Sequence, residues 1–154
     1  MKNCIHILLL LVAIFFISNK NEAQEVKIKP VLNHIAVYVV DLKTSTDFYT
    51  SIVHLDTIPE PFHDGRHTWF SIGPTGHLHL IQGAKEASIH DKNSHLCFTV
   101  SSVPDFIKVL VTNNIEYENW AGEKYQVTKR VDLVNQLYFK DPDGYWIEIN
   151  DAKN

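Results

Sequence analysis

Four short segments combine a metal-binding side chain with an alternation of apolar and polar residues. Residues two apart in an extended strand share one face. The alternation therefore predicts four side chains on the polar faces of strands whose other faces are apolar: His34, His79, His95 and Glu148. Imidazole and carboxylate groups together suit zinc, nickel, iron(II), cobalt or manganese. If the four strands meet, we expect one divalent metal ion bound there.

The segment that carries His79 offers other candidates for the fourth ligand. In HLHLIQG, His77 lies on the same predicted face as His79, and Gln82 has the opposite parity. A single histidine is often only partly buried or hydrogen-bonded without binding a metal, and the chain has nine of them. The joint pattern favours a metal site, but it leaves open whether His79 or His77 is a ligand or a base.

Other polar residues have less specific interpretations. Cys97 shares the predicted face of His95, where a buried, unreactive thiol is the ordinary case. The segment HDGRH at 63–67 could bind an anionic group, although a solvated turn is the stronger interpretation. Three further side chains share the predicted polar parity and are candidate substrate contacts or packing residues: Tyr38, Gln136 and Tyr138.

The elements that would position these residues follow one order twice. A strand at 31–40 precedes a helix capped by Asp41 or Thr44, and a strand at 94–100 precedes a helix capped by Ser102. Each helix is followed by three extended segments, at 55–62, 67–73 and 77–83, then at 115–120, 131–139 and 145–149. The order strand, helix and three strands predicts an α+β protein built from two similar modules.

Length and composition limit the possible number of domains and the possible partners. A chain of 154 residues is enough for one domain, which we place at 31–151, with modules at 31–83 and 94–151 and a linker at 84–93. The net charge of −4 provides no basic surface for phosphates, so we expect no nucleic-acid partner.

The N-terminus has the layout of a secretory signal. Lys2 precedes an apolar run from Ile5 to Ile17, and a polar stretch follows. We expect cleavage after Ala23, an extension at 24–30, and export to the periplasm or the exterior. The run is shorter than the roughly 20 residues of a membrane-spanning helix, so membrane contact would require an uncleaved anchor. The mature chain would contain one cysteine and no internal disulfide.

Three segments carry a resemblance to a known family. The opening NHIAVYVVDL, the mid-chain SHLCFTV and the closing YFKDPDGYWIEI resemble the vicinal-oxygen-chelate superfamily over 31–151. This superfamily includes glyoxalase I, methylmalonyl-CoA epimerase, fosfomycin-resistance proteins, extradiol dioxygenases and bleomycin-resistance proteins. The resemblance implies paired βαβββ modules that form an eight-stranded open cup, with the helices outside and one metal ion inside.

Carried over residue by residue, the resemblance assigns the metal ligands to His34, His95 and Glu148. His79 stands where the glyoxalase and epimerase branches carry Glu or Gln, and members with three protein ligands leave it free to act as a base. Glu148 would both bind the metal and shuttle a proton. The resemblance also allows a homodimer in which two copies complete each other's cups.

The activity implied is a glyoxalase-like lyase or isomerase, acting on a small oxygen-chelating substrate through an enediolate-type intermediate. Export and the presence of only two arginines, Arg66 and Arg130, argue against the glutathione-linked reaction itself. One alternative is an iron(II) ring-cleaving dioxygenase, although such members are usually longer. Another is a non-catalytic protein that binds a small molecule such as an antibiotic, although such members generally lack the metal ligands.

Overall fold

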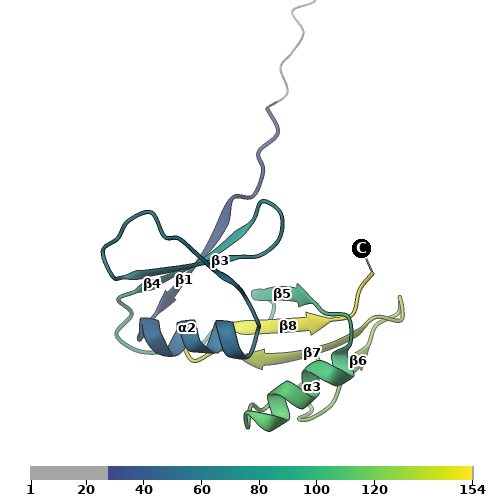
Figure 1. Cartoon of the computed structure of the whole chain (residues 1–154). Helices are drawn as coiled ribbons and strands as arrows, with labels where there is room; N and C mark the ends of the chain where they lie inside the picture. The colour runs from purple at the N-terminus through teal and green to yellow at the C-terminus, as the bar shows by residue number, and fades with distance from the viewer. Residues whose placement is uncertain (1–27, 154) are drawn as a thin grey trace, which may run out of the picture. The chain divides into compact units, whose positions relative to one another are not determined.

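A computed structural model describes residues 28–153, and Figure 1 shows the two sheets and two helices of this part of the chain. The first module contains β1 (His34–Val39), α2 (Leu42–Ser51), β2 (Thr57–Ile58), β3 (His67–Ser71) and β4 (His77–Gln82). The second contains β5 (His95–Thr99), α3 (Val103–Thr112), β6 (Thr128–Lys129), β7 (Asn135–Lys140) and β8 (Trp146–Asn150).

The two sheets have the same topology. The first has the order β1-β4-β3-β2 and the second β5-β8-β7-β6. In each, the first and last strands of the module pair in parallel, and the other pairs are antiparallel. The predicted α+β class and its duplicated layout are confirmed, and the eight strands form two four-stranded mixed sheets that are not closed.

The apolar face of each strand is buried, as the alternation predicts. Side chains that are at most 1% exposed come from both sheets: Val37, Val39, Leu78, Leu80, Leu137, Phe139, Ile147 and Ile149. They share one core with Tyr49 of α2 and Leu110 of α3. Each such side chain contributes about 1.5–3 kcal/mol of burial free energy. The apolar faces therefore fix the register of the strands, and the opposite faces are left for polar groups.

Both helices begin at predicted caps. The Asp41 side chain accepts a hydrogen bond from the Thr44 amide at 2.7 Å, so Asp41 is the cap of α2 and Thr44 is not. Ser102 caps α3 in the same way, through the Asp105 amide. These bonds satisfy amide groups that lack an intrahelical partner.

Three extended segments were predicted too long. Only Thr57–Ile58 forms a strand within 55–62, and 115–120 contributes isolated bridges at Glu118. The strand predicted from 131 begins at Asn135, because residues 131–133 form a turn in which Leu133 has a φ of 71°. Apolar residues in this turn are exposed, so the hydrophobicity of Val131 and Leu133 misled the prediction.

The DPDG turn before β8 joins the second module to the first. Tyr49 donates its hydroxyl hydrogen to Asp141 at 2.9 Å, and Ser45 donates to Asp143 at 2.5 Å. The backbone amide of Val40, just after β1, donates to the other oxygen of Asp143 at 2.7 Å. Both carboxylates are buried. The turn thus anchors the start of α2, which the sequence did not predict.

The predicted secretory signal, residues 1–23, lies outside the described residues. Within residues 28–153, neither helix has the length and apolarity needed to cross a membrane.

Candidate metal centre

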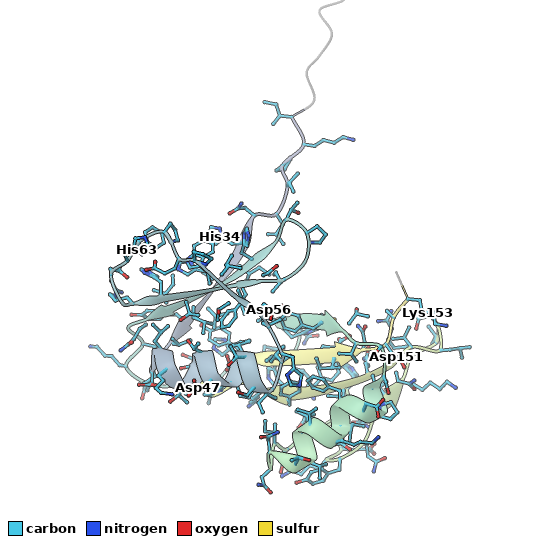
Figure 2. The ribbon with its side chains drawn as sticks, viewed as in Figure 1. His34, Asp47, Asp56, His63, Asp151 and Lys153 are labelled. Carbon is cyan, nitrogen blue, oxygen red and sulfur yellow. The ribbon has the colours of Figure 1, made fainter. Side chains whose placement is uncertain are left out.

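Strand alternation brings His34 and His79 together on the polar face of the first sheet. In the parallel pairing of β1 with β4, Ala36 is opposite His79 and His34 is opposite His77. The rings of His34 and His79 are 5.8 Å apart between centroids. Figure 2 shows His34 and His63 across this sheet from Asp47 of α2. The rival His77 packs against Trp69 at 5.9 Å.

His79 is the buried member of this pair. Its side chain is 5% exposed, and its Nε2 atom has no hydrogen-bond partner among the described protein atoms. The ring stacks on Trp69 at 4.2 Å. Burial, followed by the nearby His67 and His34, lowers the pKa of His79 from its usual 6.5. His79 is therefore neutral at pH 7, which is the form that binds metals or accepts protons.

His95 and Glu148 meet on the second sheet. His95 Nε2 lies 3.2 Å from Glu148 Oε2. His95 Nδ1 lies 2.7 Å from the carbonyl oxygen of Lys92, which can only accept, so Nδ1 carries a hydrogen. That bond fixes the ring and points Nε2 toward the carboxylate. A backbone carbonyl on the second ring nitrogen is the usual support of a metal-binding histidine.

Glu148 receives hydrogen bonds on both oxygens. Tyr138 donates to Oε2 at 2.6 Å, while Asn150 donates to Oε1 at 2.9 Å and the Cys97 thiol at 3.4 Å. Burial raises the pKa of Glu148, but these hydrogen bonds and the nearby His95 outweigh burial, so the net pKa is lowered. Glu148 is therefore a carboxylate at neutral pH, ready to bind a cation. Gln136 extends the network by donating to the Tyr138 hydroxyl.

Cys97 lies in this network as an unreactive thiol. Burial around its sulfur, and then the negative charge of Glu148, raise its pKa from 9.0 to about 12. Thiols react and bind metals as thiolates. Cys97 itself is exposed, so the expectation of a buried thiol is wrong, although the raised pKa keeps the thiol protonated at neutral pH.

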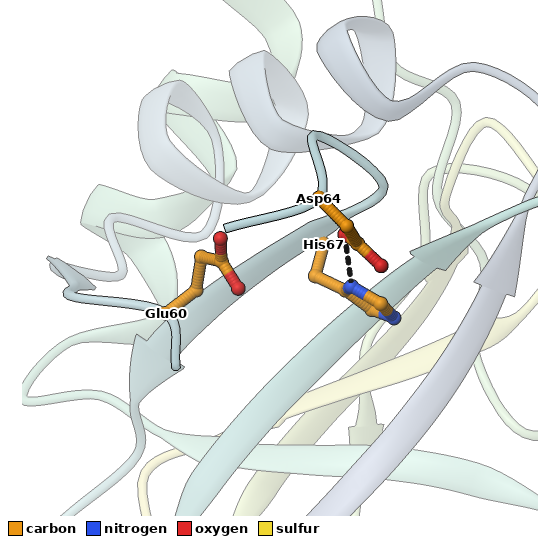
Figure 3. Close-up of side chains that lie close together, drawn as sticks. All are labelled: Glu60, Asp64 and His67. Carbon is orange, nitrogen blue, oxygen red and sulfur yellow. Dashed lines mark hydrogen bonds and ion pairs between the residues drawn. The ribbon is translucent and has the colours of Figure 1, made fainter. Parts of the chain in front are cut away.

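The four predicted ligands thus lie as two pairs, one on each sheet. Among residues 28–153, the side chains whose metal-binding atoms lie within 4.8 Å of one another in a group of three are different ones: Glu60, Asp64 and His67. Figure 3 shows this group at the loop that leads into β3. That all four predicted side chains share one ion remains a prediction.

Sequence reasoning missed this group. The segment at 63–67 was interpreted as a solvated turn, but His67 opens β3 and its side chain is 12% exposed. Glu60 and Asp64 lie in a loop, where alternation between two faces gives no information.

Comparison with known proteins agrees with this fold. The family model of the Glyoxalase/Bleomycin resistance protein/Dioxygenase superfamily matches residues 31–149, and the chain belongs to this superfamily. Its predicted resemblance to vicinal-oxygen-chelate proteins is therefore confirmed.

Relatives in this superfamily have several activities. A lactoylglutathione lyase of Pseudomonas putida is 28% identical over 155 residues, covering 77% of this chain and 83% of that protein. The metallothiol transferase FosB of Staphylococcus epidermidis is 28% identical over 123 residues, covering 77% and 80%. The crystal structure of the fosfomycin resistance protein FosX from Listeria monocytogenes is similar in fold, with a TM-score of 0.66 and 20% identity over 82% of this chain and 96% of that one. These relatives support an enzyme of this superfamily.

Proposed function

We propose that this protein is a metal-dependent lyase or isomerase of the glyoxalase type, acting on a small substrate that presents two adjacent oxygens. The observation that carries the proposal is the His95–Glu148 pair at 3.2 Å, with His95 oriented by the Lys92 carbonyl. The Glu148 carboxylate accepts three hydrogen bonds and lies next to an oriented imidazole, so these two side chains can provide two of the ligands of a metal ion.

The donor set fits one divalent transition metal. His34, His95 and Glu148 would hold it, with His79 as a fourth ligand or as a base in a three-ligand site. A bound ion of this kind acts as a Lewis acid that polarises a substrate carbonyl and stabilises the negative charge that develops on it.

The two candidate bases differ in strength. The lowered pKa of Glu148 makes its carboxylate a weak proton acceptor and a good ligand. His79 is neutral and has a buried, unpaired Nε2, so it can take a proton next to the substrate carbonyl. We therefore assign metal binding chiefly to Glu148, and count both residues as catalytic candidates.

We further propose that the two pairs complete one site between two copies of the chain. Superfamily members commonly form dimers. In this chain, the first pair and the second pair belong to separate sheets that are not closed. The His34–His79 pair of one copy would then face the His95–Glu148 pair of the other.

Metal content tests the ligand set. We expect the His34→Ala, His95→Ala and Glu148→Ala variants each to lose one bound ion per chain relative to wild type, as measured by inductively coupled plasma mass spectrometry. Full metal content in all three variants would refute the proposed centre.

Complementation tests whether the site is shared. A heterodimer of the His34→Ala and Glu148→Ala chains contains one site with both defects and one intact site, if each site combines two copies. We expect the mixture to recover metal that neither variant binds alone. If each site is built within one chain, the mixture recovers none.

A second activity has its own supporting observation. Two imidazoles and one carboxylate form the ligand set of iron(II) oxygenases. His34, His95 and Glu148 provide that set when His79 is not a ligand. Iron dependence with oxygen uptake would favour this dioxygenase over the lyase or isomerase, and a metal-free mature protein would favour a small-molecule binding function.

Export of the mature chain is part of the proposal and rests on the sequence of residues 1–23.

A further inference from the structure

Lys92 lies in the turn that leads from the linker at 84–93 into β5, and it contacts two parts of the second module. The Ser94 amide closes this turn by donating to the Asp91 carbonyl at 2.9 Å. The backbone carbonyl of Lys92 accepts the hydrogen bond of His95 Nδ1 at 2.7 Å. Its side chain forms an ion pair with Glu118. One residue thus contacts the His95 ring with its backbone and a distant segment with its ammonium group.

The Lys92 ammonium group has a hydrogen-bond partner for each of its three hydrogens. It donates to the Glu118 carboxylate, to the carbonyl oxygen of Asn119 at 3.2 Å and to that of Trp120 at 3.3 Å. The side chains of Lys92 and Glu118 are only 17% and 20% exposed. Exposed ion pairs leave both side chains mobile, but an enclosed and fully hydrogen-bonded pair keeps one geometry. The ammonium group is therefore held in one position.

Two aromatic rings on the polar face of the second sheet enclose the same ammonium group. Lys92 Nζ lies 4.9 Å from the centre of the Trp146 ring on β8 and 5.6 Å from that of the Tyr138 ring on β7. Both distances are within the roughly 6 Å over which an aromatic face attracts a cation. Tyr138 also donates to Glu148. The ammonium group therefore packs against a residue that supports the second predicted ligand of this sheet.

The segment that binds the ammonium group is itself attached to the sheet. Glu118 and Tyr138 exchange two backbone hydrogen bonds, each 2.8 Å long. The amide of Trp120 donates to Thr128 Oγ1 of β6 at 2.9 Å. Residues 118–120 are thus bound to β7 and β6. Through its ammonium group, Lys92 ties the turn before β5 to these strands.

We propose that Lys92 and Glu118 are positioning residues of the His95–Glu148 centre, an inference that rests on the proposed function. Their ion pair holds residue 92 in place. The carbonyl of that residue then keeps the hydrogen of His95 on Nδ1 and directs Nε2 toward Glu148. A group that orients a metal-binding histidine in this way raises its affinity for the ion.

Zinc affinity of the full chain tests the proposal first. Lys92→Met keeps an unbranched side chain without the charge, and Glu118→Gln keeps the shape of the carboxylate without its charge. We expect each variant to bind the Zn²⁺ ion of this centre about 10- to 100-fold more weakly in competition with a chelator. Lys92→Arg keeps a cation and its donors, so it should recover part of the affinity that Lys92→Met loses.

The tautomer of His95 gives a readout that needs no metal. Nitrogen-15 NMR of the metal-free chain, under conditions in which a free imidazole is neutral, shows which ring nitrogen carries hydrogen. We expect Nδ1 to keep its hydrogen in the wild type. In Lys92→Met and Glu118→Gln a fraction of the rings should carry it on Nε2 only, because the Lys92 carbonyl no longer fixes the ring.

The ion pair of Lys124 with Glu116 provides the matched control. It joins two residues near Glu118 at 2.9 Å, but its side chains are 62% and 50% exposed. Lys124→Met should therefore retain the zinc affinity and the His95 tautomer of the wild type.

Two results would overturn the positioning role. One is a His95 ring that keeps its Nδ1 hydrogen in both Lys92→Met and Glu118→Gln, with both variants folded by circular dichroism. The other is wild-type zinc affinity in the same two variants. Failure of the proposed function looks different: Glu148→Gln would then keep every ion that the wild type binds, while the His95 tautomer still depends on Lys92.

Discussion

The hydroxyl group of Tyr138 donates a hydrogen bond to Glu148 Oε2 at 2.6 Å, the same oxygen that lies 3.2 Å from His95 Nε2. Tyr138 thereby holds the carboxylate in place, as the Lys92 carbonyl holds the His95 ring. In this arrangement the metal-binding oxygen has little freedom before any ion is bound.

Removal of this hydroxyl should weaken metal binding without unfolding the protein. Tyr138→Phe deletes the donor that helps to lower the pKa of Glu148. We expect affinity for the His95–Glu148 ion to fall about 10- to 100-fold, as for other groups that orient a metal ligand. The loss should be larger at pH 5 than at pH 7, because Glu148 is then protonated more readily. Calorimetric titration at both values measures it.

Tyr117→Phe is the control for this experiment. Tyr117 is also a buried tyrosine, but its hydroxyl contacts the Tyr125 carbonyl at 3.4 Å, away from Glu148. Equal affinities in the Tyr138→Phe variant and the wild type would show that the hydrogen bond does not position the ligand.

The thiol of Cys97 should resist alkylation. Its pKa of about 12, against 9.0 for an ordinary thiol, reduces the thiolate fraction at pH 8 about a thousandfold. We expect iodoacetamide to modify Cys97 far more slowly in the folded chain than in urea, as followed by peptide mass spectrometry. Glu148→Gln removes the second-largest cause of the raised pKa and should accelerate the reaction. Equal rates in the folded and unfolded chains would refute this account.

Gly144 is required by the turn that joins the modules. Its φ is +90°, and a Cβ atom there would lie 2.1 Å from the backbone oxygen of Ser88. Gly144→Ala should therefore lower the free energy of unfolding by more than the roughly 1–3 kcal/mol that the backbone conformation alone costs. Gly122 has a φ of +87° but its added Cβ would meet nothing closer than 3.9 Å, so Gly122→Ala measures the backbone cost alone. Equal losses in urea unfolding of the two variants would contradict the role of the clash.

Sequence periodicity predicted the strands that carry His34, His79, His95 and Glu148, because one face of each is packed in the core. The alternation also placed His34 and His79 on the polar face of one sheet, and His95 and Glu148 on the polar face of the other, opposite the apolar residues. Periodicity could not show how the pairs lie relative to each other, because that depends on packing between sheets. Loops follow no alternation, so the contacts of Glu60 and Asp64 depend on the path of the chain and were not predictable.

Asp141 should make the folded protein less stable as the pH rises through the acid range. Burial is the main cause that raises its pKa from 3.8 to about 6, despite the hydrogen bond from Tyr49. Between pH 4 and 6 the unfolded chain releases this proton while the folded chain retains it, so the folded state binds more protons and loses stability with increasing pH. The gap between 3.8 and 6 corresponds to a loss of about 3 kcal/mol over the whole titration, which is complete only about one pH unit above the folded-state pKa.

Asp141→Asn removes this proton and should remove that part of the pH dependence. Urea unfolding at pH 4 and pH 6.5, in the presence of a chelator, compares the two proteins. The wild type should lose about 2 kcal/mol more than the variant between these conditions. The exposed Asp56, changed to Asn, serves as control and should leave the wild-type profile intact. Parallel profiles for wild type and Asp141→Asn would mean that the buried carboxyl does not hold its proton in the folded chain.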